Sequence, residues 1–392
     1  MTRSQGKKPE PRLLYFSPVF LQSYPQRPHY FIRHFLSRPE ARVLWVNPYL
    51  SRLLKWGDLR QSMALHDQNT PLPAGLQVQT PFALPLEPLP GGTALNALLF
   101  WGALQKEWRL FAEDHPLMIG IGKPSRLALM ALRTVPHQRS FFDMMDNFPA
   151  FHSGLSRRSM ERTERRILSL VDELYVSSSY LEERMSGQHR RVKKVLNAYD
   201  MQKLPPVRGS RPEGGASRSW EQIRSGKEIC FGYVGSIASW FDWRTVLRLA
   251  ETFPGHPIHL VGPLFVPLPA RLPEQIRIFG PCSHEEALAH AQKFTLGLIP
   301  FKQSLLTAGV DPIKYYEYRG LGLPILSTRF GEMALRTEED GVFFLDTDAP
   351  FEPVVQQALA WRPGEKDAFR KMNDWERRLA EARLFEGHVG GR

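Results

Sequence analysis

The sequence predicts an α/β protein made of two successive domains, each built on a parallel sheet. Short apolar segments alternate with helical segments in both halves of the chain, which is the pattern of β–α units. The stretch 206–227 is dense in Pro, Gly, Ser and Arg and is typical of a linker. With 392 residues, 42% of them hydrophobic, the chain can bury two cores. We therefore expect domains at 1–205 and 228–370 around that linker, and a terminal helix at 371–392 that returns to the first domain.

In the first half, apolar runs of strand length are followed by segments with helical spacing. Residues 58–93 are rich in Pro and Gly and lack a clear period, so we expect loops with short strands there. The other expected elements are strands at 13–20, 42–47, 117–121 and the start of 173–185, a strand that runs into a loop at 140–148, and helices at 29–36, 93–111, around 157–171 and at the end of 173–185.

The alternation restarts after the linker. A strand at 229–237 ends in a Gly-rich loop, and Ser283 with Glu286 three residues later forms a capping box for a helix at 285–293. The other expected elements are a helix at 243–253, strands at 258–263, 276–281, 294–301 and 325–326, and a charged helix from Phe369 to about Glu386.

The segment 309–324, GVDPIKYYEYRGLGLP, contains a cation and a carboxylate, Lys314 and Glu317, three residues apart. Pro312 favours a helix start there, which places both groups on one face of the first turn. An ammonium in this position can bind phosphate and a carboxylate can bind sugar hydroxyls. An ordinary solvated pair is the alternative. Because apolar strands precede and follow the segment, it lies at the carboxyl edge of a parallel sheet, which favours the ligand-binding interpretation.

The positive charge of the chain belongs to its first half. Residues 1–205 contain 28 Lys and Arg against 17 Asp and Glu, whereas residues 206–392 contain 23 of each. This charge has three interpretations: a solvated face, contact with anionic lipid head groups, or nucleic-acid binding. The third would depend on net charge alone, because no zinc-finger spacing, RNP-like strand or basic zipper is present, so we expect no nucleic-acid partner. The basic residues cluster at Arg157, Arg158, Arg162, Arg165 and Arg166, and again at His189, Arg190, Arg191, Lys193 and Lys194.

Two classes of protein are disfavoured. No apolar run approaches the ~20 residues that cross a bilayer, and the basic N-terminus leads into a strand-like segment rather than a long apolar core. We therefore expect a cytoplasmic protein, possibly peripheral on the inner face of the plasma membrane. Cys230 and Cys282 are too few and too far apart to form a metal site alone or a disulfide framework.

Seven segments, in order along nearly the whole chain, carry a resemblance to a known family. They are FSPVFLQSYPQRPHYFIRHFL, IGIGKPS, FFDMMDNFPAF, VLNAYD, FGYVGSIASWFDW, LGLIPF and TAGVDPIKYYEYRGLGLPILST. Together they resemble GT-B glycosyltransferases of the large retaining family 4, in particular the bacterial subgroup that builds surface polysaccharides, teichuronic-acid-type transferases among them. The resemblance implies two Rossmann-like domains facing each other across a cleft, and transfer of a sugar from a nucleotide-diphosphate sugar to a cell-surface or extracellular polysaccharide acceptor, lipid-linked.

The resemblance implies that donor binding lies in the second half. Glu317 matches the second glutamate of the family's E-x7-E motif, which binds the donor ribose, and Lys314 matches the basic residue that faces the diphosphate. Gly235 and Ser236 match the Gly-rich loop that approaches the same diphosphate. We expect Lys314 and Glu317 to be the central residues of the site.

The loop that passes beneath the transferred sugar matches Thr307, Gly309 and Val310. Gly309 stands where the family has the first glutamate of its motif, so this carboxylate is absent from the chain. Asp311 is one candidate to replace it, and backbone amides are the other.

No cofactor or metal is expected, because Lys314, helix N-termini and loop amides can stabilise the leaving diphosphate. The acids Asp143 and Asp146 could instead serve as caps, contact the acceptor or bind a divalent ion. In related enzymes this neighbourhood lines the acceptor side. Arg27, in the loop after the first strand, is either a surface arginine or a contact to phosphate or acceptor.

Three other functions remain open on the sequence. A GT-B sugar-nucleotide epimerase would use the same donor without an acceptor. A non-catalytic binding partner in a polysaccharide assembly complex would be consistent with the missing glutamate. A basic nucleic-acid-binding protein would show steeply salt-dependent binding.

Overall fold

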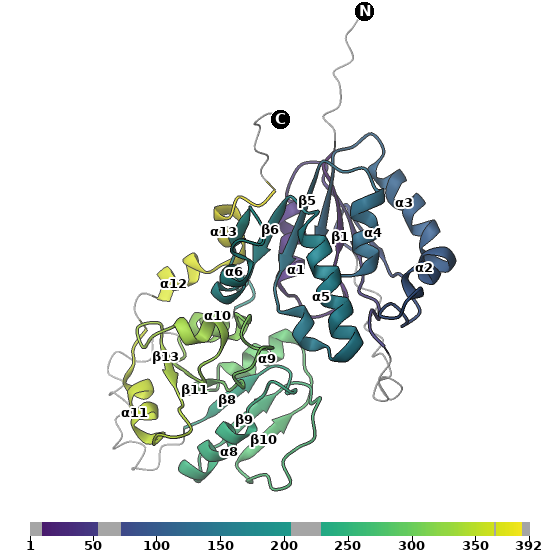
Figure 1. Cartoon of the computed structure of the whole chain (residues 1–392). Helices are drawn as coiled ribbons and strands as arrows, with labels where there is room; N and C mark the ends of the chain where they lie inside the picture. Colours follow the sequence, from purple (N-terminus) through teal and green to yellow (C-terminus); the bar gives the residue numbers. More distant parts are fainter. Residues whose placement is uncertain (1–9, 54–71, 205–228, 364–365, 386–392) are drawn as a thin grey trace, which may run out of the picture. The chain divides into compact units, whose positions relative to one another are not determined.

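The computed structural model describes residues 10–53, 72–204, 229–363 and 366–385. These residues form two compact units, each with its own parallel sheet (Figure 1). The first unit contains the described residues up to Val195 and again from Ala382, and the second contains Leu196–Glu381. The boundary lies ten residues before the one expected from composition, and the expected linker, 206–227, lies outside the described residues.

The first unit is built on a seven-stranded parallel sheet with the order β3-β2-β1-β4-β5-β6-β7. Its central strands are apolar runs such as LLYF and VLWV, because helices cover both faces of a parallel sheet. Leu13, Leu14 and Tyr15 are fully buried as a result. The strands are β1 Arg12–Phe16, β2 Arg42–Val46, β3 Leu76–Gln79, β4 Leu117–Ile121, β5 Arg139–Met144, β6 Glu173–Val176 and β7 Val192–Lys194.

The helices of the first unit include the four that the sequence predicts and one that it does not, α4. The helix expected at 93–111 is confirmed in extent, but its middle, Ala97–Trp101, is a π-helical turn between α2 and α3. The buried face of this helix carries Trp101 and Trp108, both fully enclosed. The helices are α1 Arg27–Leu36, α2 Gly92–Asn96, α3 Gly102–Ala112, α4 Arg126–Thr134, α5 Gly154–Leu168 and α6 Ser179–Met185, with a 3-10 turn at Phe148–Phe151.

The second unit is built on a six-stranded parallel sheet with the order β10-β9-β8-β11-β12-β13. Its strands are β8 Phe231–Val234, β9 Ile258–Val261, β10 Ile276–Phe279, β11 Leu296–Ile299, β12 Ile325–Ser327 and β13 Val342–Phe344. Its helices are α8 Trp243–Thr252, α9 His284–Ala291, α10 Ile313–Gly320, α11 Glu352–Ala360, α12 Lys366–Met372 and α13 Trp375–Glu381, with a 3-10 turn at Gly331–Leu335.

Both sheets grow outward from their first strand in two directions. In the first unit the chain runs β1 to β3 on one side and then starts β4 on the other side of β1. In the second unit it runs β8 to β10 and then starts β11 beside β8. Ligands of open α/β sheets bind outside the carboxyl ends of the strands at such a reversal. The fold therefore provides one candidate position in each unit.

The single helix expected from Phe369 to about Glu386 is wrong, because the chain breaks at Asn373–Asp374 into α12 and α13. The segment around Tyr199 pairs with the break: the Tyr199 N–H donates to the Asn373 carbonyl, and the Trp375 N–H donates to the Tyr199 carbonyl. The Asp374 carboxylate accepts the N–H of Glu376 and so caps α13. A long-range contact thus interrupts a segment with helical propensity.

The chain returns to the first unit as a short segment rather than as a helix. α13 belongs to the second unit, and the residues from Ala382 belong to the first. The ring of Phe385 lies 5.3 Å from the ring centroids of both Phe35 and Phe141. The Leu384 carbonyl accepts a hydrogen bond from Arg38. This return segment, Ala382–Phe385, covers the end of α1 and β5.

Among the residues that the structure describes, no helix is long and apolar enough to cross a membrane.

Candidate functional site

The reversal point of the second sheet brings the loop after β8 against α10. Gly235, the first residue after β8, has a φ of +139°, which favours glycine. A Cβ on Gly235 would lie 2.5 Å from Lys314 Nζ, and a Cβ on Gly262, at the end of β9, would overlap the Gly235 carbonyl. A side chain at either position would displace its neighbour. The structure therefore places Gly235 and Lys314 in contact, 79 positions apart in the sequence.

Hydrogen bonds fix the backbone of this loop. The N–H of Val234 donates to the hydroxyl of Tyr318 on α10 at 2.8 Å, and the Gly235 N–H donates to the Val261 carbonyl at 2.7 Å. The hydroxyl of Tyr233 donates to the Ser236 carbonyl at 2.8 Å. These bonds hold the loop against α10, so Gly235 is already positioned beside Lys314 without any rearrangement.

Lys314 lies in the first turn of α10, as expected from Pro312, which is the N-cap residue. Its side chain is half-buried, with Nζ 5.5 Å from the ring centroid of Tyr233. Burial lowers the pKa of Lys314, and the carboxylate of Glu317 partly opposes this effect. Within the described ranges the ammonium makes no hydrogen bond or ion pair. A desolvated cation at a helix N-terminus is suited to bind an anion.

Glu317 lies one turn further along α10 and is buried. Its Oε1 lies 2.9 Å from Nε2 of His284, the first residue of α9. The predicted capping box of α9 is confirmed: Ser283 Oγ accepts the Glu286 N–H, and the Glu286 carboxylate accepts the Ser283 N–H. Sequence reasoning did not single out His284, although the capping box already placed it at the start of that helix.

The loop expected beneath the transferred sugar uses its polar groups internally. Thr307 is buried, and its hydroxyl donates to the Lys302 carbonyl at 2.5 Å. The Val310 N–H donates to the Thr307 carbonyl, and the Val310 carbonyl accepts from Glu332. Gly309 is also buried. In this structure the Thr307 side chain therefore shapes the loop and is not presented to a ligand.

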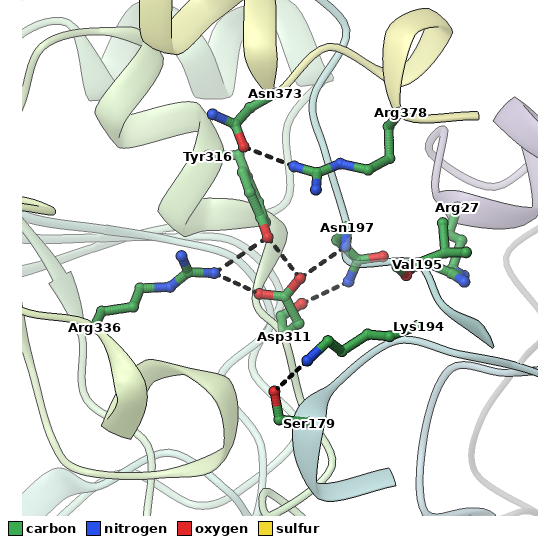
Figure 2. A network of polar contacts seen from close by, with 10 residues as sticks. All are labelled: Arg27, Ser179, Lys194, Val195, Asn197, Asp311, Tyr316, Arg336, Asn373 and Arg378. Carbon is green, nitrogen blue, oxygen red and sulfur yellow. Dashed lines mark hydrogen bonds and ion pairs between the residues drawn. The ribbon is translucent and has the colours of Figure 1, made fainter. Parts of the chain in front are cut away.

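Asp311, the candidate to replace the missing glutamate, binds other residues of the protein with its carboxylate (Figure 2). Its Oδ1 accepts from Arg336 at 2.9 Å, and its Oδ2 accepts from the Tyr316 hydroxyl at 2.8 Å and from the Asn197 N–H at 2.7 Å. The Asn197 amide also donates to the Asp311 carbonyl. Both carboxylate oxygens are thus occupied in a buried network. The pattern of the sequence offered no signal for it, because Asn197 and Arg336 are distant along the chain.

Arg27 and Asp143, expected on the acceptor side, instead bind each other. Both side chains are fully buried in the first unit, and the guanidinium donates to Asp143 Oδ1 at 2.7 Å and to the Val195 carbonyl at 2.5 Å. The two charges therefore neutralise each other inside the unit. Asp146 lies two residues beyond β5 and is half-buried, and burial raises its pKa to about 7. Of the three expected acceptor-side residues, only Asp146 is partly exposed.

No group of three or more His, Cys, Asp or Glu residues with metal-binding geometry occurs in the described part of the chain.

Comparisons with known proteins agree on the architecture. No family model matches the sequence. The solved structure of sucrose-phosphate synthase from Thermosynechococcus elongatus is 14% identical, with a TM-score of 0.63, over 96% of this chain and 98% of that one. The Anabaena Alr3699/HepE structure in complex with UDP-glucose is 12% identical, with a TM-score of 0.62, over 95% and 98%. The chain has the GT-B glycosyltransferase fold. The fold class predicted from the sequence is confirmed.

A curated relative matches this GT-B chain in sequence. It is a Bacillus subtilis protein named "Putative teichuronic acid biosynthesis glycosyltransferase TuaH", which is 23% identical over 227 residues. The match covers 54% of this chain and 55% of that protein, so the aligned part spans about half the length of the relative.

Proposed function

We propose that the protein is a retaining glycosyltransferase that moves a sugar from a nucleotide-diphosphate sugar to a cell-surface or extracellular polysaccharide acceptor. One observation carries the proposal: the unpaired Lys314 ammonium lies against Gly235 at the reversal point of a GT-B sheet, one turn from a buried carboxylate. A cation, a glycine that leaves the backbone accessible and a carboxylate together suit a diphosphate that is followed by a sugar.

The chemistry asked of such a site is mainly electrostatic. Negative charge builds on the nucleoside diphosphate as the bond to the sugar breaks, and preorganised donors in a dry site stabilise that charge. Lys314 supplies a full charge, and the fixed loop at Gly235 and Ser236 allows the backbone to approach the phosphates. We propose that transfer needs no metal or other cofactor.

Glu317 provides the first test of the donor site. A carboxylate that accepts hydrogen bonds from ribose hydroxyls contributes roughly tenfold to a hundredfold in affinity. We expect Glu317→Ala to weaken donor binding by this factor while the protein remains folded. The measurement is a thermal-shift titration with UDP, GDP, ADP, CMP and their sugar conjugates, with and without Mg²⁺, since a ligand of the native state raises the midpoint.

The matched control is Glu285→Ala, which removes an exposed glutamate from the first turn of α9. It should leave the nucleotide shift unchanged. An equal shift in the wild type and in Glu317→Ala would contradict the donor-site assignment. Dependence of the shift on Mg²⁺ would contradict metal-independent transfer.

The acceptor is proposed from the name of the curated relative, which refers to teichuronic acid biosynthesis. A polysaccharide that grows at the envelope, on a lipid carrier, would bring its acceptor to the inner surface of the membrane. The first unit suits that place, because five exposed arginines lie on α5. Exposed leucines of the α2–α3 segment of the same unit, such as Leu98 at 82% and Leu99 at 55%, add apolar contact area.

We expect the protein to bind anionic liposomes in preference to neutral ones at low salt. Because each well-placed cation contributes roughly 1 kcal/mol, changing Arg157, Arg158 and Arg162 together to Gln should weaken binding about a hundredfold in liposome co-sedimentation. Arg244, Arg271 and Lys293, which are exposed on the second unit, changed together to Gln, are the control for net charge. Equal binding to neutral and anionic liposomes would remove the peripheral-membrane proposal.

One observation favours a second candidate, a non-catalytic partner in a polysaccharide assembly complex. Gly309 supplies no carboxylate, and both oxygens of the Asp311 carboxylate are occupied. Absence of any shift with every nucleotide in the same screen would favour this candidate over the transferase.

A further inference from the structure

The reversal point of the first sheet holds a pocket that the donor site does not use. It lies at the carboxyl ends of β1, β2 and β4, beside the start of α4, and is a small hollow that is partly open to solvent. Its polar lining includes Ser17, Asn47, Ser51, Lys123 and Ser125. The corresponding position in the second unit is the site of Gly235 and Lys314, so the proposed donor site and this pocket lie at equivalent places of the two sheets.

Most polar groups around this pocket are already satisfied. The Ser17 hydroxyl donates to the Val19 carbonyl, and Asn47 bonds Leu21, Trp45 and Thr80. The N-terminal amides of α4 are occupied as well, because Glu87, Tyr49 and Ser125 accept hydrogen bonds from the first three of them. A ligand of this pocket must therefore be recognised by the side chains that remain.

Two side chains of the pocket lack partners among the described residues. Ser51 is 9% exposed, and its buried hydroxyl makes no hydrogen bond. Lys123 is half-buried and forms neither a hydrogen bond nor an ion pair within the same residues. Leaving a buried hydroxyl and a desolvated ammonium unpaired is costly, whereas an oxygen-rich anion would satisfy both.

The electrostatics around the pocket favour an anion. Burial lowers the pKa of Lys123, an effect that Glu87 opposes and Arg52 reinforces. Burial also lowers the pKa of Arg126, with further lowering by Arg166 and Arg162 of α5. Glu87 is the only carboxylate among these influences, and burial raises its pKa to about 7, so it is partly neutral at neutral pH. The surroundings of the pocket are thus positive.

We propose that this pocket binds a phosphate group, with the Lys123 ammonium as its counter-charge and the Ser51 hydroxyl as a hydrogen-bond donor. A phosphate offers several strong acceptors to the two unpaired donors, and the partly open hollow lets it approach from solvent. The phosphate group is the shared chemistry of two sources, a phosphorylated soluble molecule and a phosphorylated lipid. The idea that this phosphate belongs to the acceptor of sugar transfer rests on the proposed function, whereas phosphate binding by the pocket does not.

The test is calorimetric titration of the full chain with inorganic phosphate at constant ionic strength. We expect Lys123→Met to weaken phosphate binding about tenfold or more, and Ser51→Ala to weaken it severalfold, since hydrogen bonds to a charged group are the stronger ones. Lys106→Met, an exposed lysine on α3 of the same unit, is the matched control and should bind as the wild type does. Ser51→Ala removes one atom only, so it tests the pocket even if Lys123→Met fails to fold.

Lys314→Met separates this pocket from the donor site. Phosphate binding that is lost in Lys314→Met but unchanged in Lys123→Met would belong to the second unit and would overturn the proposal. The proposal would also be overturned if the wild-type protein bound neither inorganic phosphate nor either of the two probes described below. Conversely, Lys123-dependent phosphate binding in a protein that binds no nucleotide would support this site while the proposed transferase function failed.

Two further arms identify the source. Glycerol 3-phosphate in solution and vesicles of phosphatidylcholine containing phosphatidic acid present the same phosphate monoester. If binding of glycerol 3-phosphate is lost in Lys123→Met but kept in Lys106→Met, the pocket binds a soluble phosphate. If binding of the phosphatidic acid vesicles shows this pattern, the pocket binds a lipid head group. Unchanged binding of both probes by Lys123→Met would overturn the proposal.

Discussion

Replacing Lys314 with methionine is expected to lower kcat by roughly 10²–10³-fold, the loss typical when one preorganised donor to a developing negative charge is removed. Methionine has a similar length and fits the half-buried position beside Gly235 and Tyr233. The change removes the charge and leaves the volume. The measurement is the initial rate of nucleoside diphosphate release from the sugar nucleotide that gives the largest thermal shift.

The ratio of effects on kcat and KM distinguishes the role of Lys314 from simple donor binding. A group that stabilises the departing diphosphate lowers kcat, whereas one that contacts bound donor and transition state equally raises KM alone. Lys293→Met, at an exposed lysine of the same unit, is the control. A normal kcat in Lys314→Met would exclude Lys314 from the chemistry and leave it, at most, a binding role.

Replacing Arg27 with methionine is expected to reduce the free energy of unfolding by about 3–5 kcal/mol, because it leaves the Asp143 carboxylate buried without its partner. Both side chains are fully enclosed, and the guanidinium also satisfies the Val195 carbonyl. Urea denaturation measures the change. The exposed pair Arg157–Glu161 gives the comparison, since Arg157→Met should cost less than about 1 kcal/mol.

A double variant shows whether the loss of stability comes from the unpaired Asp143 charge. Arg27→Met combined with Asp143→Leu removes both charges, so we expect it to recover most of the stability lost in Arg27→Met. An Arg27→Met protein as stable as the wild type would show that Asp143 is solvated or protonated, and would restore Arg27 and Asp143 as candidates for acceptor contact.

Local sequence patterns predicted most of the elements of this chain. The apolar runs of β1, β4 and β11, the Pro312 start of α10 and the capping box of α9 all depend on residues within a few positions of one another. The spacing of Lys314 and Glu317 predicted that they lie on one helix face. The order of strand and helix predicted that this helix begins at the carboxyl edge of the sheet.

Contacts between distant residues were not predictable in the same way. Arg27 and Asp143 are 116 residues apart, and nothing in the pattern around either indicated the other. The occupied carboxylate of Asp311 and the unpaired hydroxyl of Ser51 depend on which neighbours the fold supplies. The break at Asn373–Asp374 arises from pairing with Tyr199, which overrides the helical propensity of the segment.

The return segment Ala382–Phe385 has a consequence for how the protein is made. The face of the first unit that includes Phe31, Phe35 and Phe141 receives Phe385 only after the whole of Leu196–Glu381 has left the ribosome. At 5–20 residues per second this interval is on the order of ten seconds or more. During it an aromatic surface of the nascent chain is uncovered, so the first unit emerges first but is completed last.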